Sequence, residues 1–406
     1  MQSIRYLFFI FVGLLFYGNP AFAGEPFVSC IERLKQQALE ASISEQVVET
    51  VLARVEYSPR VIELDRKQPE FSKTFYNYYR QRVTADRVEL GRKLLRTHSQ
   101  LLRSLTRQYG IPAHYLVAFW GMETNFGRYL GKMNVLNSLA TLACDQRRSE
   151  FFTTQLMDAL WLVDAEHVRP EQMLGSWAGA MGNMQFMPST YRQYSRDGDN
   201  NGKVDLWNSL DDAFTSAAYY LNQLGWQRNW RWGREVLLPA EFDYGLAGLP
   251  NARPLKEWAD FGLVDVRKQP LPKLEESAAL IVPAGYRGPA FLVYDNFRVI
   301  MKWNMSEFYA LSVGVLADRI NGAGRLTVPP PKTDDFNISE IKKTQEALNT
   351  LGYNAGPVDG IFGSQTKYAL RQFQSENGLI ADGFLHQNVL KMLKNKAEKN
   401  KNPALK

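Results

Sequence analysis

A single glutamate, Glu123, closes the apolar helical segment "PAHYLVAFWGMET" at 112–124. On a helix, the residues three and four positions back share its face, and here these are Trp120 and Phe119. Apolar neighbours withdraw water from a carboxylate and raise its pKa, as a general acid at neutral pH requires. Phe126 joins this face if the helix extends that far. The alternative is a structural glutamate paired with an arginine at the helix end.

A glycine-rich segment follows, "GSWAGAMGNMQFMPSTY" at 175–191. Its glycines let the backbone approach a ligand closely. Ser176, Asn183 and Gln185 supply neutral hydrogen-bonding groups that suit hydroxyl and amide partners. A phosphate-binding loop is excluded because no Gly-Lys-Ser/Thr follows. The alternative is a glycine turn packed between helices.

An acidic segment, "DGDNNGKVDLWNSLDDA" at 197–213, has the start of a calcium-binding loop. The residues at positions one, three, five and seven, the last through its backbone carbonyl, are Asp197, Asp199, Asn201 and Lys203. Position twelve is Asn208 rather than glutamate, so Asp211 or Asp212 would have to close a longer loop. We expect a structural Ca²⁺ here and no cofactor for catalysis. The alternative is an acidic turn that caps a helix.

The elements that carry these residues are mainly helical over 25–235. "CIERLKQQALEASI" and "RVELGRKLLRTHSQLLRSLTRQYG" have apolar spacings of three and four, and the second is predicted to end at Gly110. From about 236 to 300, "AALIVPAG" and "PAFLVYDNFRVIMKW" indicate strands in a small insertion. "SEFYALSVGVLADRI" is again typical of a helix. The sequence therefore predicts a mainly α (α+β) fold.

The 406 residues, 45% of them hydrophobic, are enough for more than one globular domain. Arg5, an apolar run and Ala21-Phe22-Ala23 indicate a signal peptide cleaved after Ala23, and hence a periplasmic protein; an uncleaved membrane anchor is the alternative. The predicted divisions are a signal peptide 1–23, a main domain 24–325, a proline-rich linker 326–337, a compact helical module 338–394 and a basic disordered tail 395–406.

Charge and cysteine content limit the classes of partner. Removal of the signal peptide with Arg5 lowers the net charge from +6 to +5, which suits an anionic polymer, a membrane surface or plain solubility. Nothing resembles a nucleic-acid-binding module, and no later segment is long enough for a stable membrane span. Cys30 and Cys144 are predicted to form one disulfide in an oxidising compartment, with two buried free thiols as the alternative.

Four segments together resemble the B-type lytic murein transglycosylases over about 25–325. They are "WGMETNFGRYLGKMNVLNSLATLA", the glycine-rich segment, "SAAYYLNQLGW" and "VYDNFRVIMKWNMSEFYALSV". Residues 338–394, with "LGYNAGPVDGIFGSQTKYALRQFQ", resemble a peptidoglycan-binding domain. The resemblance implies a lysozyme-like helical core, a small β-containing insertion and a helical C-terminal module.

The resemblance also implies the reaction. Glu123 would act as acid and then base in cleaving the β-1,4 bond between MurNAc and GlcNAc, leaving a 1,6-anhydroMurNAc end. The implied substrate-binding residues are Ser176, Gln185, Tyr220, Asn304 and Tyr309, and the family also accepts tyrosine at the place of Trp303. The expected partners are peptidoglycan glycan strands, with other cell-wall enzymes as a further candidate. A muramidase-type hydrolase and a non-catalytic peptidoglycan-binding protein are the alternatives.

Overall fold

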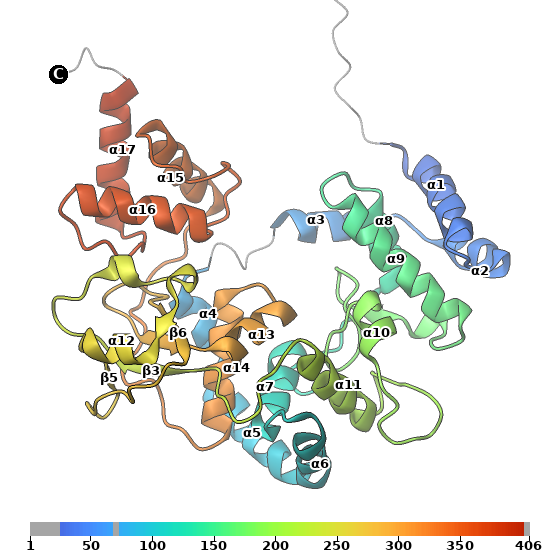
Figure 1. Cartoon of the computed structure of the whole chain (residues 1–406). Coiled ribbons are helices and arrows are strands. Elements are labelled where there is room, and N and C mark those ends of the chain that lie inside the picture. The colour runs from blue at the N-terminus through green and yellow to red at the C-terminus, as the bar shows by residue number, and fades with distance from the viewer. Residues whose placement is uncertain (1–24, 68–72, 402–406) are drawn as a thin grey trace, which may run out of the picture.

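The computed structural model describes residues 25–67 and 73–401 of the chain (Figure 1). The predicted signal peptide, 1–23, and residues 402–406 lie outside the described residues. Helices make up most of the two described ranges, which confirms the mainly α fold predicted from the sequence. In these ranges, no helix is both long enough and apolar enough to cross a membrane.

One side of the molecule is a helical lobe fastened by a disulfide bond (Figure 1). Its helices are α1 (Phe27–Glu40), α2 (Glu45–Thr50), α3 (Pro59–Lys67), α8 (Val135–Ala143) and α9 (Ser149–Asp164). Cys30 in α1 is bonded to Cys144 at the end of α8, so the disulfide prediction is confirmed. The buried carboxylate of Asp65 also accepts a hydrogen bond from Arg147 Nη1 at 2.9 Å and pairs with Arg148. These bonds fasten α3 to the chain that follows α8.

Helix α7 (Ala113–Thr124) is apolar on every side and buried, as the sequence predicts. The helices packed around it are α5 (Ala85–Thr97), α6 (Ser99–Tyr109), α11 (Leu210–Gln223) and α14 (Glu307–Ile320). The prediction of one helix over 87–110 is wrong, because the helix is interrupted at His98, which separates α5 from α6. The His98 ring packs against Trp120 and Phe214, with centroids 5.9 and 6.2 Å away. Gly110 ends α6 at φ 80°, as predicted.

A five-stranded antiparallel sheet forms the predicted insertion. In sheet order its strands are β4 (Arg253–Pro254), β6 (Ser277–Ile281), β7 (Ala290–Val293), β3 (Gly233–Leu237) and β5 (Val264–Asp265). The strand prediction over 289–303 is wrong after β7, because α13 (Asp295–Trp303) follows it. The exposed positions Asp295, Arg298 and Lys302 recur at spacings of three and four, so the other face is buried as a helix requires.

The C-terminal module consists of α15 (Ile338–Thr350), α16 (Ser364–Glu376) and α17 (Gln387–Lys401). It contains one arrangement twice. The buried side-chain amide of Gln345 donates to the Asp359 carboxylate at 2.9 Å. Its oxygen accepts the backbone N–H of Gly360, the residue after Asp359, at 2.9 Å. Gln374 makes the same two bonds, each 2.8 Å, with Asp382 and the residue after it. Each helix therefore fixes the Asp-Gly loop that follows it.

The disordered tail predicted at 395–406 is wrong for 395–401, which continue α17. Leu390, Leu393 and Ala397 are all buried, so the apolar stripe of the helix extends into the lysine-rich segment at spacings of three and four. The amide of Asn400 also donates to the carbonyl of Thr350 in α15 at 3.0 Å. The high lysine content of this segment reflects a solvated helix face.

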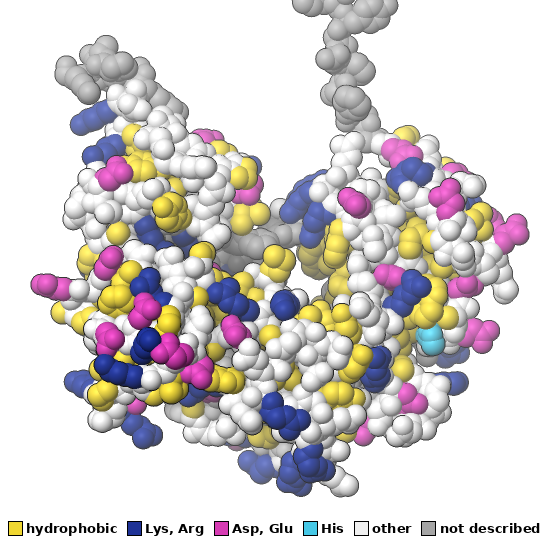
Figure 2. Space-filling view, viewed as in Figure 1, with side chains coloured by type: hydrophobic (Ala, Val, Ile, Leu, Met, Phe, Trp, Pro, Cys, Tyr) yellow, Lys and Arg dark blue, Asp and Glu magenta, His cyan; other side chains and the backbone are white. Residues whose placement is uncertain are grey.

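The face of the molecule seen in Figure 2 carries charges of both signs. Figure 2 shows Lys and Arg interspersed with Asp and Glu on this face, with a hollow between the N-terminal lobe and the C-terminal module.

Short elements connect the parts of the molecule. They are η1 (Leu52–Arg54), α4 (Phe75–Arg82), β1 (Met133–Asn134), η3 (Pro170–Gln172), β2 (Leu174–Gly175), α10 (Pro188–Tyr194), η4 (Tyr244–Leu246), η5 (Leu249–Asn251) and α12 (Leu255–Asp260).

We expect the double substitution Cys30→Ser/Cys144→Ser to lower the free energy of unfolding by about 2–5 kcal/mol. The bond joins residues 114 positions apart, so its loss frees a long loop in the unfolded chain. Urea unfolding followed by circular dichroism measures the change. A reductant should lower the midpoint of the wild type and leave that of the variant unchanged. Equal stability of the two oxidised proteins would contradict a stabilising role.

Candidate active site

Glu123 is a partly exposed residue near the C-terminal end of α7. Between Tyr115 and Thr124, every residue of the helix is buried except Glu123, which is partly exposed. The helix ends directly after it, because Asn125 and Phe126 both take left-handed backbone conformations, at φ 51° and 62°. The helix therefore does not extend to Phe126, and the condition under which this residue would join the helical face is not met. Its ring folds back against Trp120, with centroids 5.7 Å apart.

Two hydrogen-bond donors reach the same oxygen of this carboxylate. Trp303 Nε1 at the end of α13 donates to Glu123 Oε1 at 3.0 Å, and the hydroxyl of Tyr309 in α14 donates to it as well. Burial, together with the charge of Glu123, raises the pKa of Tyr309 well above its ordinary value, so the phenol remains a donor. The environment of Glu123 is thus apolar with two directed donors, and the expectation of apolar walls alone was incomplete.

An aromatic wall continues from this pair. The Trp303 ring contacts Phe119, Phe186 and Tyr220, with centroids 4.5, 5.4 and 5.2 Å away. The Tyr220 ring also contacts that of Tyr194, with centroids 4.6 Å apart. Of the predicted site residues, Tyr309 therefore contacts Glu123 directly, and Tyr220 is brought to its neighbourhood through Trp303. Trp303 and Tyr220 are partly exposed, and aromatic faces of this kind can stack on sugar rings.

The glycine-rich segment folds against the loop that follows Glu123. Strands β1 and β2 pair Met133 with Gly175, and a Cβ on Gly131 would lie 2.1 Å from the Gly175 carbonyl oxygen. Gly131 also has φ 89°, so this approach of two backbones requires glycine. Gln185 stabilises the same junction, because its amide donates to the carbonyl of Leu130 at 3.1 Å.

Ser176 and Asn304 make local bonds in this structure. The Ser176 hydroxyl accepts the backbone N–H groups of Ala178 and Ala180 at 3.3 and 3.0 Å and so shapes the glycine turn. Asn304 is exposed next to Trp303, and its side-chain oxygen accepts the N–H of Ser306 at 3.2 Å. Contact of these two residues, and of Gln185, with a substrate stays a prediction.

Asn183 links three segments, and it is not available to a ligand as the sequence suggested. Its side chain is buried, accepts from Trp120 Nε1 at 2.9 Å and donates to the carbonyl of Trp207 at 2.8 Å. Its own carbonyl accepts from the hydroxyl of Thr124 at 2.9 Å. This network connects α7, the glycine-rich segment and the acidic loop. The motif revealed the polar residue, but its partners on α7 lie about 60 positions earlier in the chain.

The acidic loop brings three of the predicted ligands together. Oxygens of Asp197, Asp199 and Asp212 lie within 4.8 Å of one another, which makes them a group able to hold a metal ion. Asp212 is buried and also accepts the backbone N–H groups of Gly198 and Asp205, at 2.7 and 2.8 Å. Asp211 is exposed and lies outside this group. Of the two candidates, Asp212 lies with the other carboxylates and Asp211 does not.

The other two residues of the loop make bonds within it. Asn201 accepts the N–H of Lys203 at 2.9 Å through its side-chain oxygen. Its own N–H donates to Asp197 at 3.1 Å and to Asp199 at 3.2 Å. The loop is therefore fixed by its own backbone around a cluster of carboxylates, and hard oxygen donors of this kind fit Ca²⁺.

Comparison with known proteins gives two family matches. The model described as "Transglycosylase SLT domain" matches residues 26–318, and the one described as "Putative peptidoglycan binding domain" matches 337–393. Membrane-bound lytic murein transglycosylase B of Escherichia coli (strain K12) is 33% identical over 249 residues. That match covers 60% of this chain and 66% of the relative.

Solved structures resemble this one over most of its length. SltB3 from Pseudomonas aeruginosa in complex with NAG-anhNAM-pentapeptide has a TM-score of 0.87 and 43% identity, covering 91% of this chain and all of that one. The Escherichia coli lytic transglycosylase Slt35 in complex with calcium has a TM-score of 0.63 and 28% identity. It covers 74% of this chain, and 94% of its own length is matched.

We expect Tyr309→Phe to lower kcat by roughly 10- to 100-fold, because a hydrogen bond to a charged group contributes about 1.5–3 kcal/mol. Since the ring and its packing are kept, the melting temperature should change little. The measurement is initial rate on purified glycan strands. The control is Tyr57→Phe, at an exposed tyrosine of the N-terminal lobe. Wild-type turnover in Tyr309→Phe would show that this donor does not contribute to catalysis.

Proposed function

This chain belongs to the transglycosylase SLT domain family, and we infer that it is a peptidoglycan lytic transglycosylase. It cleaves the β-1,4 bond between MurNAc and GlcNAc and leaves 1,6-anhydroMurNAc ends. The observation that carries this inference is the carboxylate of Glu123, the one partly exposed residue of Tyr115–Thr124, with Trp303 and Tyr309 donating to one of its oxygens. The SltB3 structure, a complex with NAG-anhNAM-pentapeptide, supports the same chemistry.

One carboxylate suffices when the substrate supplies the nucleophile. Glu123 gives its proton to the glycosidic oxygen as the bond from that oxygen to the anomeric carbon breaks. The 6-hydroxyl of the same MurNAc then attacks the anomeric carbon, and its proton passes to Glu123. The carboxylate ends in its starting protonation state, and no water is consumed. Trp303 and Tyr309 stabilise the ionised form between the two proton transfers.

The remaining parts fit action on the cell wall. The 1–23 segment directs export to the periplasm, and the module at 338–394 binds peptidoglycan. Both proposals rest on sequence pattern, and the second also on the family match at 337–393. Other cell-wall enzymes as partners stay a prediction. The hydrolase alternative needs a second carboxylate that holds a water near Glu123.

The mass of the products tests this reaction. Digestion of purified murein should give ends that lack one water relative to reducing sugars. Glu123→Gln keeps the size of the side chain but removes its proton, so turnover should fall by at least about 100-fold, the scale of general acid catalysis. Binding to insoluble murein should survive. Products with reducing ends only would identify a hydrolase, and unchanged turnover in Glu123→Gln would remove the role assigned to this residue.

We also propose a structural Ca²⁺ in the acidic loop. Asp197, Asp199 and Asp212 would hold it through carboxylates, with Asn201 and the carbonyl of Lys203 as further oxygen ligands. The bound ion would offset the repulsion among three close carboxylates, and it has no part in the chemistry at Glu123. The convergence of carboxylate oxygens in this loop supports the proposal, as does the calcium complex of Slt35.

Added Ca²⁺ should raise the melting temperature, because an ion at 100 times its Kd stabilises the folded state by about 2.7 kcal/mol. Asp212→Asn should abolish the calcium-dependent shift. Asp211→Asn is the matched control, since the neighbouring residue is exposed and lies outside the cluster. Differential scanning calorimetry with Ca²⁺ and with a chelator measures both. The absence of a shift in the wild type would contradict the proposal.

A further inference from the structure

The C-terminal module is docked on the catalytic core by specific polar contacts. Arg371 Nη1 in α16 donates to the carbonyl of Ala247 at 2.6 Å, and the N–H of Tyr286 donates to the Asp382 carboxylate at 3.0 Å. Lys367 forms an ion pair with Glu307 at 2.8 Å. A binding domain that only raised the local concentration of the enzyme at its substrate would not need such contacts with the core.

The linker is fixed as well. The N–H groups of Thr327 and Val328 donate to the Glu235 carboxylate of β3 at 2.9 and 2.8 Å. Farther along, Asp335 accepts from the N–H of Thr74 at 2.6 Å and from the amide of Asn77 at 3.1 Å. The segment is therefore held against the core near both of its ends.

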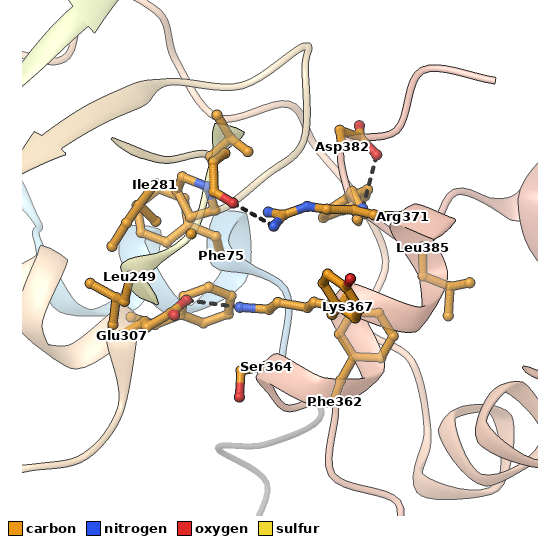
Figure 3. A pocket seen from close by; sticks show the side chains of 18 of the residues that line it. Phe75, Leu249, Ile281, Glu307, Phe362, Ser364, Lys367, Arg371, Asp382 and Leu385 are labelled. Atoms are coloured by element: carbon orange, nitrogen blue, oxygen red, sulfur yellow. Dashed lines mark hydrogen bonds and ion pairs between the residues drawn. The ribbon is translucent and has the colours of Figure 1, made fainter. Parts of the chain in front are cut away.

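A cavity of about 370 Å³ lies between the module and the core, with mainly apolar walls. Figure 3 shows Lys367 extending from the module to Glu307 on the core side of this cavity. The two side chains are only 26% and 23% exposed. Burial alone would raise the pKa of Glu307, but the ammonium of Lys367 outweighs it and keeps the pKa below its ordinary value. The ionised form of Glu307 is thus stabilised mainly by Lys367, with a further contribution from Arg371.

Glu307 is the first residue of α14, two positions before Tyr309. Between them, Phe308 packs on Phe75 with centroids 5.4 Å apart, and the ammonium of Lys367 lies 5.8 Å from the Phe308 ring. The N–H of Tyr309 donates to the hydroxyl of Ser306, the N-cap, at 3.3 Å. One helical turn therefore carries the docking ion pair on one side and the donor to Glu123 on the other.

We propose that Lys367 is a positioning residue for catalysis: its ion pair with Glu307 fixes the first turn of α14 and thereby the Tyr309 hydroxyl on Glu123. The proposal rests on the proposed function, because it concerns the rate of that reaction. Loss of the ammonium removes the ion pair of Glu307 and leaves its carboxylate beside apolar side chains with only the more remote charge of Arg371, which favours a shift of the turn toward solvent. A small displacement of a catalytic contact has a large effect on rate.

The test uses the full-length protein and soluble glycan oligomers without stem peptides. Lys367→Met should lower kcat roughly 5- to 50-fold, since displacement by ~1 Å can cost ~100-fold. KM should change less than about twofold, because the sugar-binding wall is untouched. Lys367→Arg should restore most of the rate, because the charge returns. Lys396→Met is the matched control, at an exposed lysine of α17.

A double-mutant cycle separates positioning from general destabilisation. If Lys367 acts through Tyr309, Lys367→Met should have less than about a twofold effect on kcat when Tyr309 is already Phe. Independent, multiplying effects would overturn the proposal. So would a Lys367→Met protein that loses only its retention on insoluble murein and keeps wild-type kcat on soluble oligomers.

Two further measurements separate a failure to fold and a failure of the proposed function from a failure of this proposal. If Lys367→Met does not fold, as judged by circular dichroism, Lys367→Met/Glu307→Gln removes the unpaired charge and should show the same loss of kcat; wild-type kcat in this variant would overturn the proposal. The product masses from the wild type decide the proposed function separately. Reducing ends would disprove transglycosylation and leave the comparison of rates between variants intact.

Discussion

Burial of α7 is the constraint on which the rest of the structure depends. A helix without a polar face has to be enclosed by neighbours on every side, and the two helices before it in the chain, α5 and α6, provide that enclosure together with the distant α11 and α14. From Tyr115 to the end of the helix, their packing leaves one partly exposed position, which Glu123 occupies. The carboxylate is therefore fixed by the hydrophobic core itself, and its rigidity follows from the same contacts that stabilise the fold.

The left-handed turn after α7 also fixes the loop that follows Glu123. Because the chain reverses at Asn125 and Phe126, the following loop runs back to meet the glycine-rich segment. Ser176 and Gln185, the polar residues of that meeting point, make hydrogen bonds that shape the loops. The functional and structural interpretations of these residues do not conflict, since a loop that must approach a sugar closely must first be held in one conformation.

Sequence reasoning reached the parts of the site that depend on local pattern. Glu123, the buried helix and the acidic loop follow from spacing along the chain. It could not assign Trp303 as a donor to Glu123, because that bond joins residues 180 positions apart. The choice between Asp211 and Asp212 was open for a related reason, since helix phase decides which of two adjacent carboxylates turns inward. The strand predicted at 295–303 failed because β-branched and aromatic residues also suit a buried helix face.

The two Asp-Gly loops of the C-terminal module have different surroundings. In the second loop, Asp382 accepts an N–H from the core, whereas Asp359 of the first loop is exposed. The docked module therefore has the Asp382 loop against the core and the Asp359 loop exposed to solvent. If the exposed side of the module binds peptidoglycan, the distance between the bound site and the bond that is cleaved is fixed by the structure. Cleavage would then occur at a set distance from the bound site, whereas a flexibly tethered domain would allow a range of distances.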